Sequence, residues 1–176
     1  MRKPSLTYLF LALLAATAIA QPPEQPLPDE AKRRLEGILG TWDSTWQRLN
    51  PQGEVVRTWE GTEEGSWAIE GRVVLLSTEV PSQNSRSRGF LYYSEADGLF
   101  HLTSVDSRGD LWLLSGALDE YVITSEPKPQ RNGMELTIRF THHETDADHF
   151  SSVMETSVDG GETWRRAVLQ DLVRRH

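Results

Sequence analysis

The sequence predicts an all-β protein: about ten antiparallel strands in a meander that closes into a barrel, preceded by one short helix. Three observations lead to this fold. Helical periodicity ends at Gly40 and does not return. Runs of alternating apolar and polar residues follow, most clearly at Met134–Phe140. Pairs such as Asp97-Gly98 and Asn132-Gly133 separate the runs, and they favour hairpins because their residues accept positive φ.

Turn sequences divide the chain after Gly40 into ten strand-like segments. A meander of ten strands either leaves two unpaired edges or closes, and closure removes the edges. No internal repeat of fixed period supports a propeller instead. The expected strands are Thr41–Leu49, Glu54–Trp67, Arg72–Val80, Ser87–Ser94, Leu99–Asp106, Asp110–Leu118, Glu120–Glu126, Met134–His142, His149–Val158 and Thr163–Val173.

One helix is expected, over Asp29–Gly40. Asp29 is suited to cap its first turn. Leu35, Ile38 and Leu39 lie three and four residues apart, so they share one apolar face. A short helix with one apolar face must cover another surface, and we expect it to plug one end of the barrel.

The amino terminus predicts export. Arg2 and Lys3 precede an apolar run, and Ala18-Ile19-Ala20 is a typical signal-peptidase site, so residues 1–20 are expected to be a signal peptide. Gln21–Pro28 is half proline and is expected to be an extended linker. Residues 29–176 then form one barrel domain, and we expect the mature protein to be periplasmic or secreted.

Charge and composition exclude several classes of partner. Loss of the signal peptide moves the formal net charge from −8 to −10, and such an acidic chain is a poor nucleic-acid binder. No membrane attachment is expected after cleavage. The chain has no cysteine, which excludes disulfides and thiolate metal sites and leaves stability to the core.

Three patches resemble a known family. Leu35–Trp42 combines a short helix with Gly-x-Trp, Ile69–Arg72 is a turn, and Met154–Trp164 reads like a closing hairpin. These patches are similar to the DUF1579 family of bacterial proteins, a branch of the lipocalin-like (calycin) barrels. The resemblance covers about Leu35 to Arg174. It implies a lipocalin-like barrel and no known activity.

The resemblance also implies a structural role for one pair of residues. In a closed meander the first and last strands pair, so Trp42 is expected to lie beside Arg174, with Arg175 as the alternative partner. By strand parity Trp164 shares the face of Arg174. In calycins such a Trp–Arg pair closes the barrel floor, and an arginine over an indole contributes about 0.5–2 kcal/mol.

Two short motifs are interpreted as turns. Ser157–Trp164 fits the Asp-box of sialidase propellers, but a single copy in a short chain favours a hairpin in which Asp159 binds its own turn and Trp164 packs beneath it. Arg108-Gly109-Asp110 spells an integrin motif, and its place between two strands favours a β-turn.

The histidines do not predict a metal or a cofactor. Metal binding by His142, His143 and His149 is disfavoured because His142 and His143 are adjacent and point to opposite faces of a strand. His101 lacks a haem-ligand motif. We therefore expect no cofactor and no metal, and we assign no catalytic residue.

Aromatic residues on guessed inward faces suggest a ligand. Our first hypothesis is a binding protein for a small apolar or amphipathic molecule. The expected binding residues are Trp46, Trp59, Tyr92, His101, Trp112 and Phe140. The second hypothesis is an enzyme that uses His101 or His142 as a base. The third is a filled, non-catalytic interaction barrel, and apolar residues on both faces of Val73–Leu76 leave a homodimer as an option.

Overall fold

The computed structural model describes residues 26–130 and 133–176 of the chain. The expected signal peptide and most of the expected linker lie outside these residues. No helix in the described ranges is long and apolar enough to cross a membrane. After α1 (Asp29–Gly37) and apart from a 3-10 turn η1 (Pro81–Gln83), the elements are β1 (Gly40–Leu49), β2 (Val55–Ile69), β3 (Val73–Val80), β4 (Ser85–Ser94), β5 (Leu99–Asp106), β6 (Leu111–Ala117), β7 (Val122–Ser125), β8 (Lys128–Pro129), β9 (Glu135–Asp146), β10 (His149–Ser157) and β11 (Arg165–Arg174).

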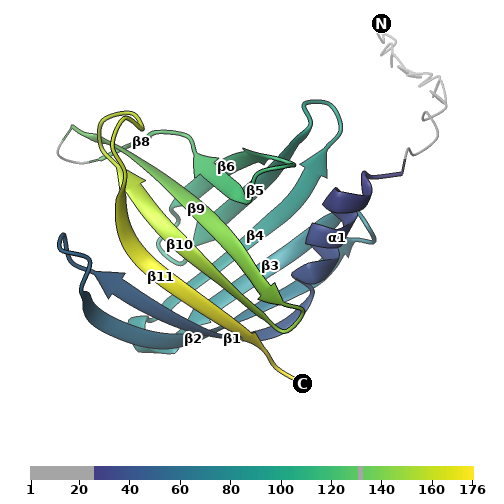
Figure 1. Cartoon of the computed structure of the whole chain (residues 1–176), viewed down its shortest axis with the longest axis horizontal. Helices are drawn as coiled ribbons and strands as arrows, with labels where there is room; N and C mark the ends of the chain where they lie inside the picture. The colour runs from purple at the N-terminus through teal and green to yellow at the C-terminus, as the bar shows by residue number, and fades with distance from the viewer. Residues whose placement is uncertain (1–25, 131–132) are drawn as a thin grey trace, which may run out of the picture.

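The strands form a closed antiparallel barrel, which confirms the predicted fold (Figure 1). β1 pairs with both β2 and β11, and β9 pairs with both β7 and β10. The ring therefore contains ten strands, with β8 as a short extra strand beside β9. The sequence did not predict β8, because two residues that include a proline carry too little strand pattern.

The helix ends at Gly37, one of the two glycines that the sequence offers as its end, and it starts differently than expected. Leu39 N–H bonds the carbonyl of Glu36 before the chain turns into β1 at Gly40. Asp29 is itself helical and does not cap the helix; Pro28 precedes it without a side-chain cap. The end before Gly40 has a physical reason, since Gly40 takes φ +110°, which no helix allows.

α1 lies across one end of the barrel, as its apolar face predicts (Figure 1). Ala31 and Leu35 are fully buried and pack against Val74, Leu91 and Phe100 of β3, β4 and β5. Full burial of a leucine contributes about 1.5–3 kcal/mol, so this contact fixes the helix in the barrel end. The core of the protein therefore lies at this end and leaves the rest of the interior open.

Arg174 and Trp42 form the barrel floor where the first and last strands meet. They are register partners in the β1–β11 ladder, and the Arg174 guanidinium lies 4.1 Å from the centre of the Trp42 ring. Arg174 also donates to the carbonyls of Leu39, Gly37 and Ala147 at 2.5–3.2 Å. One side chain therefore joins β11, the helix end and the β9–β10 hairpin.

Gly40 is required for this contact. A Cβ at Gly40 would lie 2.7 Å from a terminal nitrogen of Arg174, and its φ of +110° is in the region that favours glycine. Arg175, the alternative partner, instead pairs with Asp43, and both side chains are more than half exposed.

Trp164 does not share the face of Arg174, contrary to the parity argument. The β10–β11 ladder shifts register between Met154 and Glu155, so that Met154 pairs with Val168 and Glu155 with Arg166. The extra residue in β11 reverses the face of everything before it. Trp164 accordingly stacks on Arg139, whose guanidinium lies 4.2 Å from the ring centre, and Arg139 pairs with Glu155.

The outer face of β4, β5 and β6 carries exposed apolar side chains. Phe90, Val105, Leu111 and Leu113 are each at least 39% exposed. α1 does not cover them, because it packs on the inner face of the sheet. Pairing of two copies of the chain over these strands stays a prediction.

The contact between Arg174 and Trp42 predicts that substitution of Arg174 destabilises the fold more than substitution of its neighbour Arg175. Arg174→Gln removes the stacking on Trp42 and the charged hydrogen bonds to backbone carbonyls, so we expect it to lower the free energy of unfolding by about 2–4 kcal/mol. Arg175→Gln removes an exposed, solvent-screened ion pair and is expected to change the free energy of unfolding little. Urea unfolding followed by tryptophan fluorescence measures both, and equal losses in the two variants would contradict the assignment.

Candidate functional site

The barrel encloses a cavity of about 1320 Å³. Its wall includes residues from α1 and from all ten strands of the ring, and it extends from Arg34 at the helix end to Asn84 and Arg108 at the opposite end. Ligand pockets in proteins usually measure about 300–1000 Å³, so this interior has room for a small molecule. Side chains of the described residues do not fill the barrel, contrary to the filled-core alternative.

Four of the six expected binding residues line the cavity. They are Trp46, Trp59, Trp112 and Phe140. Trp46 and Trp59 are direct register partners across β1 and β2, so their rings lie at the same level of the barrel. The wall therefore combines large aromatic surfaces with aliphatic side chains such as Leu136.

Tyr92 and His101 lie on the outer face of the barrel instead. Their neighbours Leu91 and Phe100 line the cavity, and adjacent residues of a strand point to opposite faces. Tyr92 and His101 stack on each other with ring centres 5.2 Å apart, and His101 pairs with Asp97 at 2.9 Å. The structure thus removes His101 from the cavity as a candidate base.

Sequence reasoning missed a polar network within the cavity. Gln170 of β11 donates from its amide nitrogen to Oε1 of Glu63 on β2, and its amide oxygen accepts from the Ser152 hydroxyl at 2.8 Å. Gln170 reaches across β1 because Ser44 and Gly61, which are paired there, are small. The available signal was parity: Glu63 lies four residues after Trp59 and therefore on the same face.

Glu63 is held in an environment that disfavours its charge. Burial raises the pKa of the Glu63 carboxyl to about 7, and the hydrogen bond from Gln170 only partly opposes this effect. The side chain is partly accessible, from the cavity rather than from the outer surface. At neutral pH the cavity wall therefore contains a carboxyl that gains or loses its proton readily.

His142 also faces the cavity. It lies between Phe140 and Phe150, with ring centres 6.3 Å from each. Burial, with added repulsion from Arg34 and His143, lowers the pKa of His142 to about 4. The imidazole is therefore neutral at physiological pH and acts as a polar hydrogen-bonding group in an aromatic wall.

Arg34 lines the helix end of the cavity and has three partners there. Its Nε donates to Glu30 at 2.9 Å, a terminal nitrogen donates to the carbonyl of Glu120 at 2.7 Å, and its guanidinium lies 3.8 Å from the Tyr121 ring centre. The two neighbouring arginines hold the pKa of Glu30 down to about 2, mainly through hydrogen bonds. This cluster anchors α1 to the β6–β7 loop.

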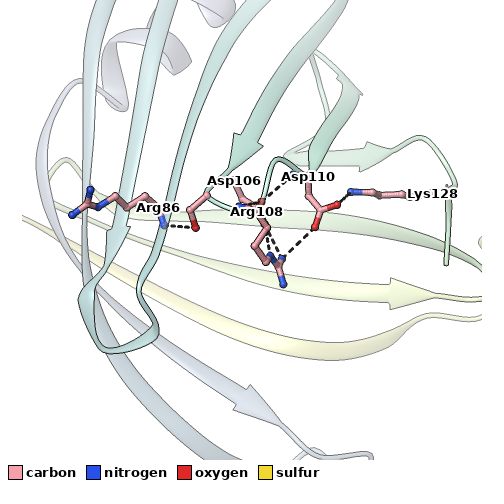
Figure 2. Close-up of polar contacts among 6 residues, drawn as sticks. Arg86, Asp106, Arg108, Asp110 and Lys128 are labelled. Atoms are coloured by element: carbon pink, nitrogen blue, oxygen red, sulfur yellow. Dashed lines mark hydrogen bonds and ion pairs between the residues drawn. The ribbon is translucent and has the colours of Figure 1, made fainter. Parts of the chain in front are cut away.

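The β5–β6 loop contributes Asp106 and Arg108 to the opposite end of the cavity lining, and Figure 2 shows the polar contacts within this loop. Asp106 accepts hydrogen bonds from the backbone of Arg108 and Asp110 at 2.9 and 3.1 Å, and Gly109 takes φ +83°. Lys128 pairs with Asp110 at 2.8 Å and lies 4.5 Å from the Trp112 ring centre. Arg108-Gly109-Asp110 is therefore a tight turn, as predicted.

The Asp-box-like segment is also a turn, as predicted. Asp159 accepts from the Ser157 hydroxyl at 2.6 Å and from the backbone and hydroxyl of Thr163 at 3.0 and 2.5 Å. These bonds hold the pKa of Asp159 far below its usual range. The oxygens of Asp159 are therefore used within its own turn.

The histidine-rich hairpin does not assemble a metal site from the residues with described positions. No group of three His, Cys, Asp or Glu side chains among them is placed to hold an ion. His142 points into the cavity, while His149 pairs with Asp171 at 2.6 Å on the outer face. Strand parity places His142 and His143 on opposite faces, as the sequence argument anticipated, and His142, the one that faces the cavity, does not join His149.

Residues 27–174 match the family model described as "Protein of unknown function (DUF1579)". The chain belongs to the DUF1579 family. The match covers the helix and the whole barrel, and it confirms the resemblance seen in the helix-to-strand entry and the closing hairpin. No curated protein matches this DUF1579 chain.

Two solved structures share the fold of this DUF1579 protein. Rv2717c from M. tuberculosis is 17% identical, with a TM-score of 0.57 over 86% of this chain and all of that one. A DUF3598-family protein with unknown function from Nostoc punctiforme is 15% identical, with a TM-score of 0.51 over 89% of this chain and 53% of that one. At these sequence identities the two comparisons show a shared barrel fold only.

The raised pKa of Glu63 predicts a pH dependence of stability. Between about pH 4.5 and pH 7 the folded state holds a proton that the unfolded state has lost, so the free energy of unfolding falls as pH rises, by up to about 3 kcal/mol. Glu63→Gln removes this loss, and Glu64→Gln, on the outer face, retains it. Urea unfolding at pH 5, 6, 7 and 8 measures the difference, and parallel curves for the two variants would rule the effect out.

His142 predicts the opposite slope at acid pH. Its lowered pKa means that the unfolded state binds a proton that the folded state excludes, so the free energy of unfolding falls as pH drops from about 6.5 to 4. His142→Phe, with an aromatic ring between two others, should resist this acid loss by up to about 3 kcal/mol. His143→Gln on the outer face serves as the control, and acid unfolding identical to that of the original chain in both would argue against a buried neutral imidazole.

Proposed function

We propose that this DUF1579 protein is an exported soluble barrel that binds a small apolar or amphipathic molecule in its cavity. The single observation that supports this most strongly is the aromatic lining of an interior of about 1320 Å³. An open interior leaves Trp46, Trp59 and Trp112 without the packing partners that a filled core would give them. A ligand that covered these rings would bury apolar surface at about 25 cal/mol per Å².

The polar groups of the wall favour an amphipathic ligand over a hydrocarbon. The hydrogen-bonded pair Glu63–Gln170 and the imidazole of His142 lie at separate points on a largely apolar surface. A few placed polar groups in an apolar pocket orient a ligand and select it. The ligand that fits this wall has an apolar body and at least one polar group.

Export is part of the proposal and is supported by the amino-terminal sequence. Arg2 and Lys3, the apolar run and Ala18-Ile19-Ala20 have the order of a cleaved signal. A core that needs no disulfide folds in either the periplasm or the medium. Comparison of the mass of the protein in culture or periplasm with that of a chain starting at Gln21 tests this part.

An enzyme that uses the same cavity is the second candidate, and His142 is the observation in its favour. His142 is the histidine that faces the cavity and has a perturbed pKa. A pKa of about 4 makes it a weak base at neutral pH, because a general base works best near the operating pH. His142 therefore gives acid–base catalysis less support than the aromatic lining gives binding.

A titration with 1-aminoanthracene, a neutral fluorescent apolar probe, tests the binding function. We expect saturable fluorescence enhancement with one site per chain. Trp59→Leu removes an aromatic wall contact worth about 0.5–1.5 kcal/mol and should weaken binding about 3–10-fold. Tyr92→Leu, an equal change on the outer face, should leave the affinity unchanged. Equal effects of the two variants would place the probe outside the barrel.

Native mass spectrometry of the protein purified from its own host tests for a resident ligand. A reproducible extra mass that disappears on denaturation would establish a bound molecule and give its size. Absence of both an extra mass and saturable probe binding would contradict the proposed function.

A further inference from the structure

The charged groups of the cavity differ in how fully they are already paired. Arg34 is occupied by Glu30, the carbonyl of Glu120 and the Tyr121 ring. Arg174 is occupied by three backbone carbonyls, the Trp42 ring and Asp148. Arg34 and Arg174 thus have partners from the chain itself, and Arg33, which also lines this end of the cavity, pairs with Glu30.

Glu63 differs from these arginines. Its Oε1 accepts from Gln170, and within residues 26–130 and 133–176 no hydrogen bond or ion pair reaches its Oε2. No buried side-chain oxygen or nitrogen among those residues is left unsatisfied, so Oε2 must be open to the cavity. The carboxyl therefore presents one free acceptor oxygen to whatever occupies the barrel.

No cation among the described residues forms an ion pair with Glu63. Its register partners are Trp42 on β1 and Thr78 on β3. β11 presents the neutral Gln170, and Arg174, which pairs with Trp42 at the level of Glu63, is held over the Trp42 ring and by backbone carbonyls. Farther along the wall His142 has its pKa lowered and Arg34 is paired with Glu30. An ionised Glu63 would thus be an unpaired charge in this part of the wall.

The amide of Gln170 is oriented to keep Glu63 in place. The Ser152 hydroxyl donates to the Gln170 amide oxygen, which directs the amide nitrogen at Glu63. Ser152 is 1% exposed and Gln170 is 8% exposed, so both are fixed in the wall. A carboxyl held by a buried two-residue relay from β10 and β11 is a positioned group rather than a mobile surface acid.

We propose that the ligand of this barrel carries an organic cation, an ammonium group on an apolar body, with the cation against Glu63. The proposal rests on the binding function proposed above and names its ligand class. The apolar body would extend from Glu63 toward the opposite end past Trp59, which is four residues along β2 on the same face, about 13 Å away at 3.3 Å per residue. Trp46 lies beside Trp59 at that level.

This arrangement gives binding a pH dependence of defined sign. A cation binds the ionised carboxylate, so a protonated Glu63 must release its proton before the complex forms. With the Glu63 pKa at about 7, affinity for a permanently charged ligand should rise about tenfold between pH 6 and pH 8 and level off above that. A neutral ligand of the same shape should show no such rise.

Three eight-carbon probes separate charge from apolar contact: octyltrimethylammonium, octanol and octanoate. Octyltrimethylammonium is charged at every pH, so any pH dependence of its affinity comes from the protein. Calorimetric titration at pH 8 should give the order octyltrimethylammonium, then octanol, then octanoate, with the cation at least about tenfold tighter than the alcohol. Displacement of 1-aminoanthracene by each probe confirms that they share the cavity.

Glu63→Gln is the test variant, and Glu64→Gln on the outer face of the same strand is its matched control. We expect Glu63→Gln to lose about tenfold or more in affinity for octyltrimethylammonium and to bind octanol as before. Glu64→Gln, with the same loss of one charge, should bind all three probes like the original chain.

The outcomes distinguish the two proposals. Equal affinity for cation and alcohol in the original chain, or equal behaviour of the two variants, would overturn the assignment of an ammonium ligand and leave the binding function standing. Failure of all three probes and of 1-aminoanthracene to bind would overturn both. If Glu63→Gln does not fold, the pH profile of the original chain decides: a flat profile for octyltrimethylammonium between pH 6 and pH 8 overturns the inference.

Discussion

Pairing of the first strand with the last is the contact on which the rest of this barrel depends. Without the β1–β11 ladder the sheet would have two open edges and no interior. Arg174 strengthens that seam at its base, because it stacks on Trp42 and binds carbonyls from the helix end and the β9–β10 hairpin. The same contact sets where α1 ends, since Gly40 must leave room for the guanidinium. Closure of the barrel, the Arg174–Trp42 contact and the position of α1 therefore depend on one another.

Closure also determines what kind of interior the chain can have. Ten strands enclose more volume than the inward side chains fill, and α1 packs only one end. The remaining space is lined by tryptophans, which would cost less free energy in a packed core than beside an open cavity. The interior also holds Glu63, whose charge is destabilised there. An arrangement that gives up stability in this way is typical of a binding site.

The fold and the turns could be predicted from local sequence because they depend on short-range rules. Alternation of period two marks strands, and glycine after Asp or Asn marks hairpins, so the closed meander and the turns at Gly109 and Asp159 followed from neighbours in the chain. The face of the sheet to which a side chain points was predictable only where apolar and polar residues alternate regularly. Tyr92 and His101 had aromatic character without a parity signal, and they lie outside. Trp164 had a parity signal that a β-bulge reversed.

The sequence by itself determined a ten-stranded barrel with an amino-terminal helix and an aromatic-rich wall, because those features depend on residue type and spacing along the chain. Only the tertiary structure decided that the barrel is hollow and that Glu63 faces the hollow. Gln170 and Ser152, which hold Glu63, lie more than 80 residues away in the chain, and no local pattern relates them to it. Such a relay exists only once closure has placed β10 and β11 across β1 from β2, because hydrogen bonds between distant segments depend on register in space.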